Sequence, residues 1–270
     1  MACDITNLGS CIADALFGFI LNILNSASKP FSDIIHKLMT EPVNISAFSS
    51  IWAIIVYILS MFYGLLIVWI GLKFIVSGES PEQREKAKAD LKNTIIMMIL
   101  VQGSYYLYDL ILAVSSALTK VIFDMINSSF FQITFESSSN FGLDLLFGVI
   151  FILHLIVVMI ILLLRYIFVS AGVILFAIGI FFYFIPFLHH YGKLILNSLG
   201  TLIFLPFFFS IIFLVGSKLT GLNGFNNAKM LIMIGTLDLV IISTFLLLLF
   251  VVVKAVTKLK PVISVAKALV

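Results

Sequence analysis

Residues 142–188 read GLDLLFGVIFILHLIVVMIILLLRYIFVSAGVILFAIGIFFYFIPFL, and these 47 positions hold one Asp, one His and one Arg. A segment this long and this apolar has lipid, not water, as its solvent. Backbone amides inside hydrocarbon must be hydrogen-bonded within their own segment, and an α-helix achieves this for nearly every residue. The stretch therefore predicts membrane-spanning helices, and the expected fold class is all-α, a polytopic transmembrane helical bundle.

The rest of the chain has the same character. Of its 270 residues, 62% are hydrophobic and only 11% are charged, and the mean hydropathy is +1.22. This composition excludes a soluble domain, which needs a charged surface. The net charge of +3 comes mostly from Lys and Arg beside predicted spans, so it bears on orientation in the membrane and not on wrapping nucleic acid. We expect about five or six spans, preceded by N-terminal amphipathic or interfacial helices.

The N-terminal segment, 1–45, is predicted to be extracytoplasmic or interfacial. Residues 11–26 form an apolar helix with a narrow polar stripe that is too short to span, and a second amphipathic helix follows Pro30. No Lys or Arg precedes Lys29, so we expect no cleaved signal peptide. Cys3 and Cys11 are disulfide candidates if this end lies outside the cytoplasm, and two free buried thiols are the alternative.

Residues 46–126 predict a transmembrane helical hairpin with a charged elbow at 79–92. One span covers 52–76 and the other 94–118. Ser80 is placed to cap a new helix that begins at Pro81, and Gln83 has the spacing of a capping box. The elbow holds the densest basic cluster near any span, which predicts that it is cytoplasmic. The cluster consists of Arg84, Lys86, Lys88 and Lys92.

The remaining segments are an extracytoplasmic loop (127–141), a transmembrane bundle (142–253) and a basic C-terminal tail (254–270). Predicted spans cover 143–164, 166–188, 194–215 and 230–253, with Arg165 as one boundary and a tight connection at Lys193. Six full crossings would place the basic tail outside, against the positive-inside rule. Either the tail is an exception, or a segment after residue 142 is re-entrant or split, with Pro186 and Pro206 as candidate breaks.

The sequence holds no nucleotide loop, metal-ligand cluster, nucleophile elbow or paired carboxylates at usable spacing. We therefore expect no enzyme, no catalytic residue, no metal and no cofactor. Ionisable residues at membrane depth are costly and are functional candidates: His154, Arg165 and Asp238. Asp238 either lines an aqueous path, pairs with Arg165 or His154, or is hydrogen-bonded between helices to Ser243, Thr244 or a neighbouring backbone. His154 is either a proton carrier or a neutral packing residue.

A polar stripe is predicted along the second span. Gln102, Asp109 and Ser116 follow one another at seven-residue spacing and share a helical face. The stripe is a candidate for a pore lining or a subunit contact. The alternative is that Asp109, with the neighbouring Tyr105 and Tyr106, reaches the far interface of the membrane.

Two segments resemble parts of type IV secretion systems. The sequence LLLRYIFVSAGVILFAIGIFFYFIPFLHHYGK, at 162–193, resembles the TrbL family of polytopic inner-membrane components, with Arg165, Gly172, Gly179, Pro186 and Lys193 at the matching places. The sequence GLKFIVSGESPEQREKAKADLKNTIIMMIL, at 71–100, resembles the two-helix pilins of the same machinery. The composition of the chain, rich in Ile, Phe and Lys, is also similar to that of archaeal membrane proteins allied to the Ced DNA-import system.

These resemblances imply a scaffold or channel subunit of a conjugation, DNA-transfer or pilus apparatus in the cytoplasmic membrane. The implied partners are membrane lipid, further copies of the chain in a homo-oligomer, a secretion ATPase, a pilin and DNA cargo; no soluble small-molecule substrate is expected. One alternative is a small-solute or ion transporter with a path lined by Asp238, His154 and Arg165, although we find no internal repeat. Another is a purely structural membrane protein.

Overall fold

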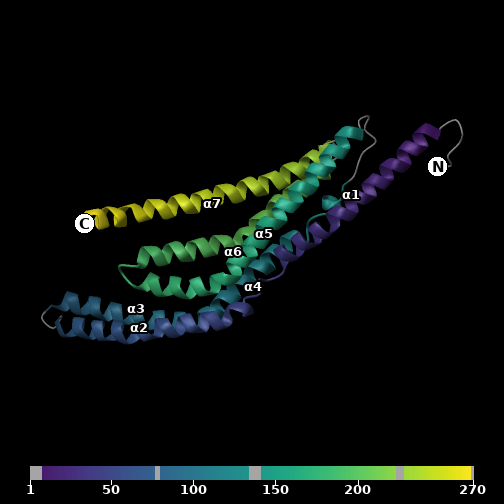
Figure 1. Ribbon diagram of the computed structural model, residues 1–270. Coiled ribbons are helices and arrows are strands. Elements are labelled where there is room, and N and C mark those ends of the chain that lie inside the picture. Colours follow the sequence, from purple (N-terminus) through teal and green to yellow (C-terminus); the bar gives the residue numbers. More distant parts are fainter. Residues whose placement is uncertain (1–7, 77–79, 134–140, 223–227, 269–270) are drawn as a thin grey trace. The chain divides into compact units, whose positions relative to one another are not determined.

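The computed structural model describes residues 8–76, 80–133, 141–222 and 228–268, and within these ranges the regular structure is helical, without a strand (Figure 1). The all-α prediction is confirmed. In chain order the elements are α1 (Leu8–Thr40), the 3-10 turn η2 (Ser46–Phe48), α2 (Ser49–Val76), α3 (Pro81–Gln102), α4 (Ser104–Phe123), the 3-10 turn η4 (Ser128–Phe131), α5 (Phe141–Phe184), α6 (His189–Thr220) and α7 (Lys229–Ala268).

Five of the described segments are long and apolar enough to cross a membrane, which indicates a multi-pass membrane protein. They are Ser46–Val76, Ser104–Phe123, Leu145–Phe184, His189–Thr220 and Lys229–Val251. This agrees with the expected five or six spans. The chain divides into two compact units, which are described separately. Unit 1 comprises Met1–Glu41, Ser116–Leu164 and Pro206–Val253, and unit 2 comprises Pro42–Ser115, Arg165–Leu205 and Lys254–Val270.

The core of unit 2 joins the α2–α3 hairpin to the C-terminal half of α5. Its buried side chains come from α2 (Val56, Leu59), α3 (Met97, Val101), α5 (Ala177, Ile180, Phe181) and the following turn (Ile185). A second cluster in the same unit joins α4, α5 and α6 through Tyr108, Leu112, Val169, Val173 and Ile203. The hairpin is therefore packed against the other helices of unit 2 and is not a free arm.

The N-terminal prediction of two short helices is wrong, because α1 runs without interruption through Pro30. A proline inside a helix removes one hydrogen bond, here the bond to the carbonyl of Ser26. Both Ser26 and Pro30 are exposed, so water or lipid headgroups can bond to the freed carbonyl.

The predicted span 94–118 is divided at Gly103, where α3 ends and α4 begins. Gly103 still donates its N–H to the Ile99 carbonyl at 2.9 Å, and its own carbonyl accepts from Leu107 N–H at 3.1 Å. Next to it, the indole Nε1 of Trp52 donates to the Ser104 hydroxyl at 2.9 Å. The interruption is thus one residue long, and the start of α4 is tied to α2.

The predicted boundary at Arg165 is also wrong: α5 is one helix of 44 residues, about 66 Å long. The predicted connection at Lys193 is wrong as well, because the chain turns at 185–188 around Pro186 and Lys193 lies in α6. Any side chain at Gly192 would collide with the backbone of Tyr183, so glycine permits α6 to begin this close to the end of α5. Of the two candidate breaks, Pro186 ends a helix and Pro206 does not.

The continuous α5 changes the number of candidate crossings. Because α5 counts as one candidate span, the described residues hold five such spans and not six. The tail itself continues α7 as far as Ala268.

Candidate functional site

The elbow between α2 and α3 is built as its sequence predicts. Ser80 has an extended backbone, and its side chain accepts a hydrogen bond from the Gln83 N–H at 3.4 Å. Pro81 occupies the first helical turn, where its missing N–H removes no helical bond. The predicted start of the helix at Pro81 is confirmed, together with the Ser80 half of the capping box.

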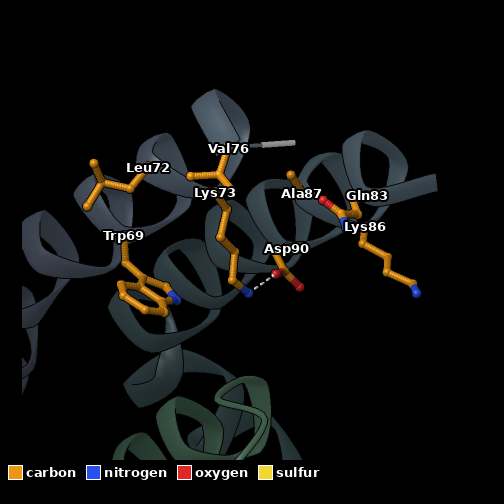
Figure 2. Close-up of a pocket in the computed structure, with 8 residues that line it drawn as sticks. All are labelled: Trp69, Leu72, Lys73, Val76, Gln83, Lys86, Ala87 and Asp90. Atoms are coloured by element: carbon orange, nitrogen blue, oxygen red, sulfur yellow. Dashed lines mark hydrogen bonds and ion pairs between the residues drawn. The ribbon is translucent and has the colours of Figure 1, made fainter. Parts of the chain in front are cut away.

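A groove of about 430 Å³ lies between the last turns of α2 and the first turns of α3. Figure 2 shows the side chains that line it. Across it, Lys73 Nζ of α2 lies 2.7 Å from Asp90 Oδ2 of α3, and this ion pair links the two arms of the hairpin (Figure 2). The other residues that line the groove are Trp69, Leu72, Val76, Gln83, Lys86 and Ala87. The groove thus combines apolar side chains of both helices with the Lys73–Asp90 ion pair.

The four basic residues predicted for the elbow are all exposed: Arg84, Lys86, Lys88 and Lys92. Lys86 Nζ lies 2.9 Å from Glu82 Oε1 one turn away, but both side chains are largely in solvent, so the pair adds little stability. Within the described ranges, no ion pair engages the other three. The basic surface is therefore open to partners or to anionic headgroups.

The predicted polar stripe does not lie along one continuous helix. Gln102 is the last residue of α3, whereas Asp109 and Ser116 belong to α4 beyond Gly103. Gln102 and Asp109 are exposed side chains in unit 2. Ser116, in unit 1, donates its hydroxyl to the Thr40 carbonyl at 2.9 Å and so bonds to a carbonyl at the C-terminal end of α1. Ser116 thus has a packing role, and the exposed part of the stripe reduces to Gln102 and Asp109.

Arg165 is buried in unit 2, and its guanidinium bonds to two backbone carbonyls of α6. Its Nε donates to the Leu202 carbonyl at 3.0 Å, and its Nη2 donates to the Ile203 carbonyl at 3.0 Å. Pro206 explains why one of these acceptors is open: it has no N–H to donate to the carbonyl of Leu202, four residues earlier in α6. Ser115 Oγ donates to the Ile203 carbonyl as well, at 2.8 Å.

Sequence reasoning treated Pro206 as a possible break and did not connect it with Arg165. The signal was present in principle, because a proline inside an apolar helix exposes one carbonyl, and a buried arginine needs acceptors. Their spatial proximity, however, follows from the way α5 and α6 pack.

His154 and Asp238 form a hydrogen-bonded pair between α5 and α7 of unit 1. His154 Nε2 lies 2.9 Å from Asp238 Oδ1, and the other ring nitrogen, Nδ1, lies 2.7 Å from the Ile150 carbonyl. Thr244 donates to the Val240 carbonyl in its own helix. Of the predicted alternatives for Asp238, the structure therefore shows the pairing with His154.

A polar contact missed at the sequence level fixes α1 to the segment after η4. The side-chain amide of Asn25 donates to the Ile133 carbonyl at 3.0 Å, and its oxygen accepts from the Ile133 N–H at 2.8 Å. An Asn on a helix face gives no sign of such a partner 108 residues later. The predicted disulfide of Cys3 and Cys11 concerns side chains outside the described residues, and among the described side chains no three His, Cys, Asp or Glu converge as metal ligands.

Residues 44–102 match a family model described as type IV secretion system pilin, and this supports a type IV secretion system membrane component. The match covers about a fifth of the chain and confirms the predicted resemblance to that machinery for this segment. Neither a curated protein nor a solved structure matches the chain. The resemblances to TrbL and to the Ced system stay predictions.

Proposed function

We propose that this protein is a membrane-resident scaffold or channel subunit of a type IV secretion apparatus, in which a pilin-like hairpin is joined to a helical bundle. The observation that carries the proposal is the coincidence of the family match with a structural element. The match spans 44–102, and η2, α2 and α3 together span Ser46 to Gln102. The matched segment is thus one complete hairpin, from its entry turn to its end.

The connection of this hairpin favours a resident component over a pilus subunit. A single residue, Gly103, separates α3 from α4, and three further spanning helices follow α4. The hairpin is also held by the Trp52 to Ser104 hydrogen bond and by the core that it shares with α5. It cannot leave the membrane as a separate two-helix unit without cleavage of the chain.

The orientation follows from the distribution of Lys and Arg over five crossings. If each of the five candidate spans crosses once, the elbow, the 185–188 turn and the tail share one side, with ten basic residues against five on the other. The ten are Lys73, Arg84, Lys86, Lys88, Lys92, Lys193, Lys254, Lys258, Lys260 and Lys267. The positive-inside rule places that side in the cytoplasm, at the plasma or inner membrane. A fluorescent protein that folds only in the cytoplasm, fused after Val270, is expected to fluoresce; a dark but full-length fusion would reverse this orientation.

The elbow is the surface proposed to meet other parts of the apparatus. Its cations are exposed, and the secretion ATPase that the resemblance implies is one proposed partner. Further copies of the chain, a pilin and DNA cargo are the other proposed partners. Anionic headgroups are an additional ligand for the same cations.

Gene deletion followed by complementation tests this role. Loss of the protein is expected to reduce DNA transfer or secretion by the host, and the wild-type chain is expected to restore it. A chain with Arg84, Lys86, Lys88 and Lys92 all replaced by Gln is expected to reach the membrane at normal levels without restoring transfer. Replacing the exposed Lys37, Lys120 and Lys218 by Gln, on the opposite side, is the matched control. Normal transfer in the deletion strain would contradict the proposal.

A further inference from the structure

The His154–Asp238 pair lies well inside one predicted span. Asp238 is nine residues after Lys229, where the 23-residue span Lys229–Val251 begins, and His154 of α5 lies within hydrogen-bond distance of it. Nine residues of helix correspond to about 14 Å, close to the middle of a hydrocarbon layer about 30 Å thick. Ionisable side chains at such a depth are expensive, and those present commonly serve ion or proton movement.

The hydrogen bonds of His154 determine how many protons the pair holds. The Ile150 carbonyl can only accept, so the ring nitrogen Nδ1, at 2.7 Å from it, carries a proton. The 2.9 Å separation between Nε2 and Asp238 Oδ1 is a hydrogen bond, which needs one further proton between the two atoms. That proton sits either on Nε2, beside an ionised carboxylate, or on Oδ1, beside a neutral ring. Both arrangements have zero net charge, which suits the membrane interior.

The carboxyl group is not sealed by this contact. Its side chain keeps 49% of its surface exposed, against 26% for His154. One turn earlier on α7, Gly235 has no atom within 4 Å of the position that a Cβ would occupy. Residues three apart in a helix are neighbours, so the open space at Gly235 adjoins the carboxyl group. The described residues of this chain therefore leave one side of Asp238 uncovered, and a membrane-soluble reagent or a proton donor can approach it there.

We propose that His154 and Asp238 form a proton-binding site within the membrane, where one proton is held between Nε2 and Oδ1 and exchanges through the open side of Asp238. Release of this proton leaves an ionised carboxylate beside a neutral imidazole, and uptake restores the neutral pair; no other bond changes. The site stands independently of the proposed role in secretion. It differs from a static ion pair because the proton between Nε2 and Oδ1 exchanges with the surroundings.

A hydrophobic carbodiimide tests for the protonated carboxyl group. The full chain, reconstituted in liposomes, is treated with N,N′-dicyclohexylcarbodiimide, and modified peptides are identified by mass spectrometry. The carboxyl proton passes to a nitrogen of the reagent, the carboxylate oxygen adds to its central carbon, and the adduct rearranges to an N-acylurea with no leaving group. Wild-type protein is expected to gain the reagent at Asp238. Absence of the adduct from wild-type protein, with Asp238 recovered unmodified, would overturn the proposal.

Two variants and an infrared measurement complete the test. D238N is expected to lose the adduct. H154F is expected to label faster than wild type, because its carboxyl group has no partner to which it can pass the proton; equal or slower labelling would count against a shared proton. The carboxylic C=O band that D238N lacks is expected to shift to lower wavenumber soon after transfer to D2O. A band that stays unshifted would show that the carboxyl proton does not exchange with water, which would contradict the proposal. Unchanged circular dichroism of both variants verifies their folding.

Discussion

Replacing Arg165 by Met removes both hydrogen bonds that the guanidinium donates to α6. Most of the resulting loss of stability comes from one carbonyl. The Ile203 carbonyl keeps the Ser115 hydroxyl, but the Leu202 carbonyl has no helical N–H partner because residue 206 is proline. An unsatisfied buried polar group costs about 1–3 kcal/mol. Met is close to Arg in length and removes a buried charge, which offsets part of the loss of the two bonds. We expect R165M to lower the free energy of unfolding by about 1–3 kcal/mol.

A second substitution separates this mechanism from a general packing defect. P206A supplies an N–H to the Leu202 carbonyl, so it should repair R165M specifically. Its general effect on helix stability, up to about 3 kcal/mol, occurs in both backgrounds and cancels in a double-mutant cycle. P206A is therefore expected to stabilise R165M more than wild type, by about 1–3 kcal/mol.

The assay is equilibrium unfolding in mixed detergent micelles, followed by circular dichroism, for wild type, both single variants and the double variant. R84M, at an exposed elbow position, is the matched control and is expected to change stability by less than about 0.5 kcal/mol. If the effects of R165M and P206A add within about 0.5 kcal/mol, the proposed link between Arg165 and the proline-freed carbonyl is refuted.

Three further changes test the hairpins. G192A is expected to destabilise unit 2 strongly, because a Cβ there meets the preceding helix, whereas G200A in the same helix has open space and serves as its control; thermal unfolding compares them. S80A removes an N-cap and is expected to cost about 1 kcal/mol, with faster hydrogen exchange in the first turn of α3. D90N breaks the partly exposed pair with Lys73 and is expected to cost less than about 1 kcal/mol, with a smaller effect in high salt; an effect that persists in high salt would indicate a buried role.

The parts of the fold that sequence predicted depend on local chemistry. The elbow is specified within four residues by Ser80, Pro81 and Gln83, and the structure reproduces its capping bond. The span that forms α2 follows from apolar length alone. The predictions that failed concern residues whose partners are distant in the chain. Arg165 was predicted to be a helix boundary, and the sequence does not show that its acceptors, the carbonyls of Leu202 and Ile203, lie in a different helix.

The candidate site shows the same division. Composition was sufficient to single out His154, Arg165 and Asp238, since ionisable residues are rare in apolar spans. Choosing among the partners of Asp238 required the packing of α7 against α5, which periodicity does not specify. The seven-residue spacing of the polar stripe predicts one shared face only for an uninterrupted helix, and Gly103 separates Gln102 in α3 from Asp109 in α4.

The most direct test of the account is photo-cross-linking from the elbow in living cells. A photoreactive amino acid replaces Lys88, an exposed elbow position, in a chain that complements the deletion strain. Irradiation is expected to yield an adduct with the secretion ATPase or another cytoplasmic component of the apparatus, and the same probe at Lys120, on the side proposed to be extracytoplasmic, is expected to yield none. Adducts from Lys88 only with extracytoplasmic proteins, or from neither position with any secretion component, would contradict a membrane-resident secretion subunit whose hairpin faces the cytoplasm.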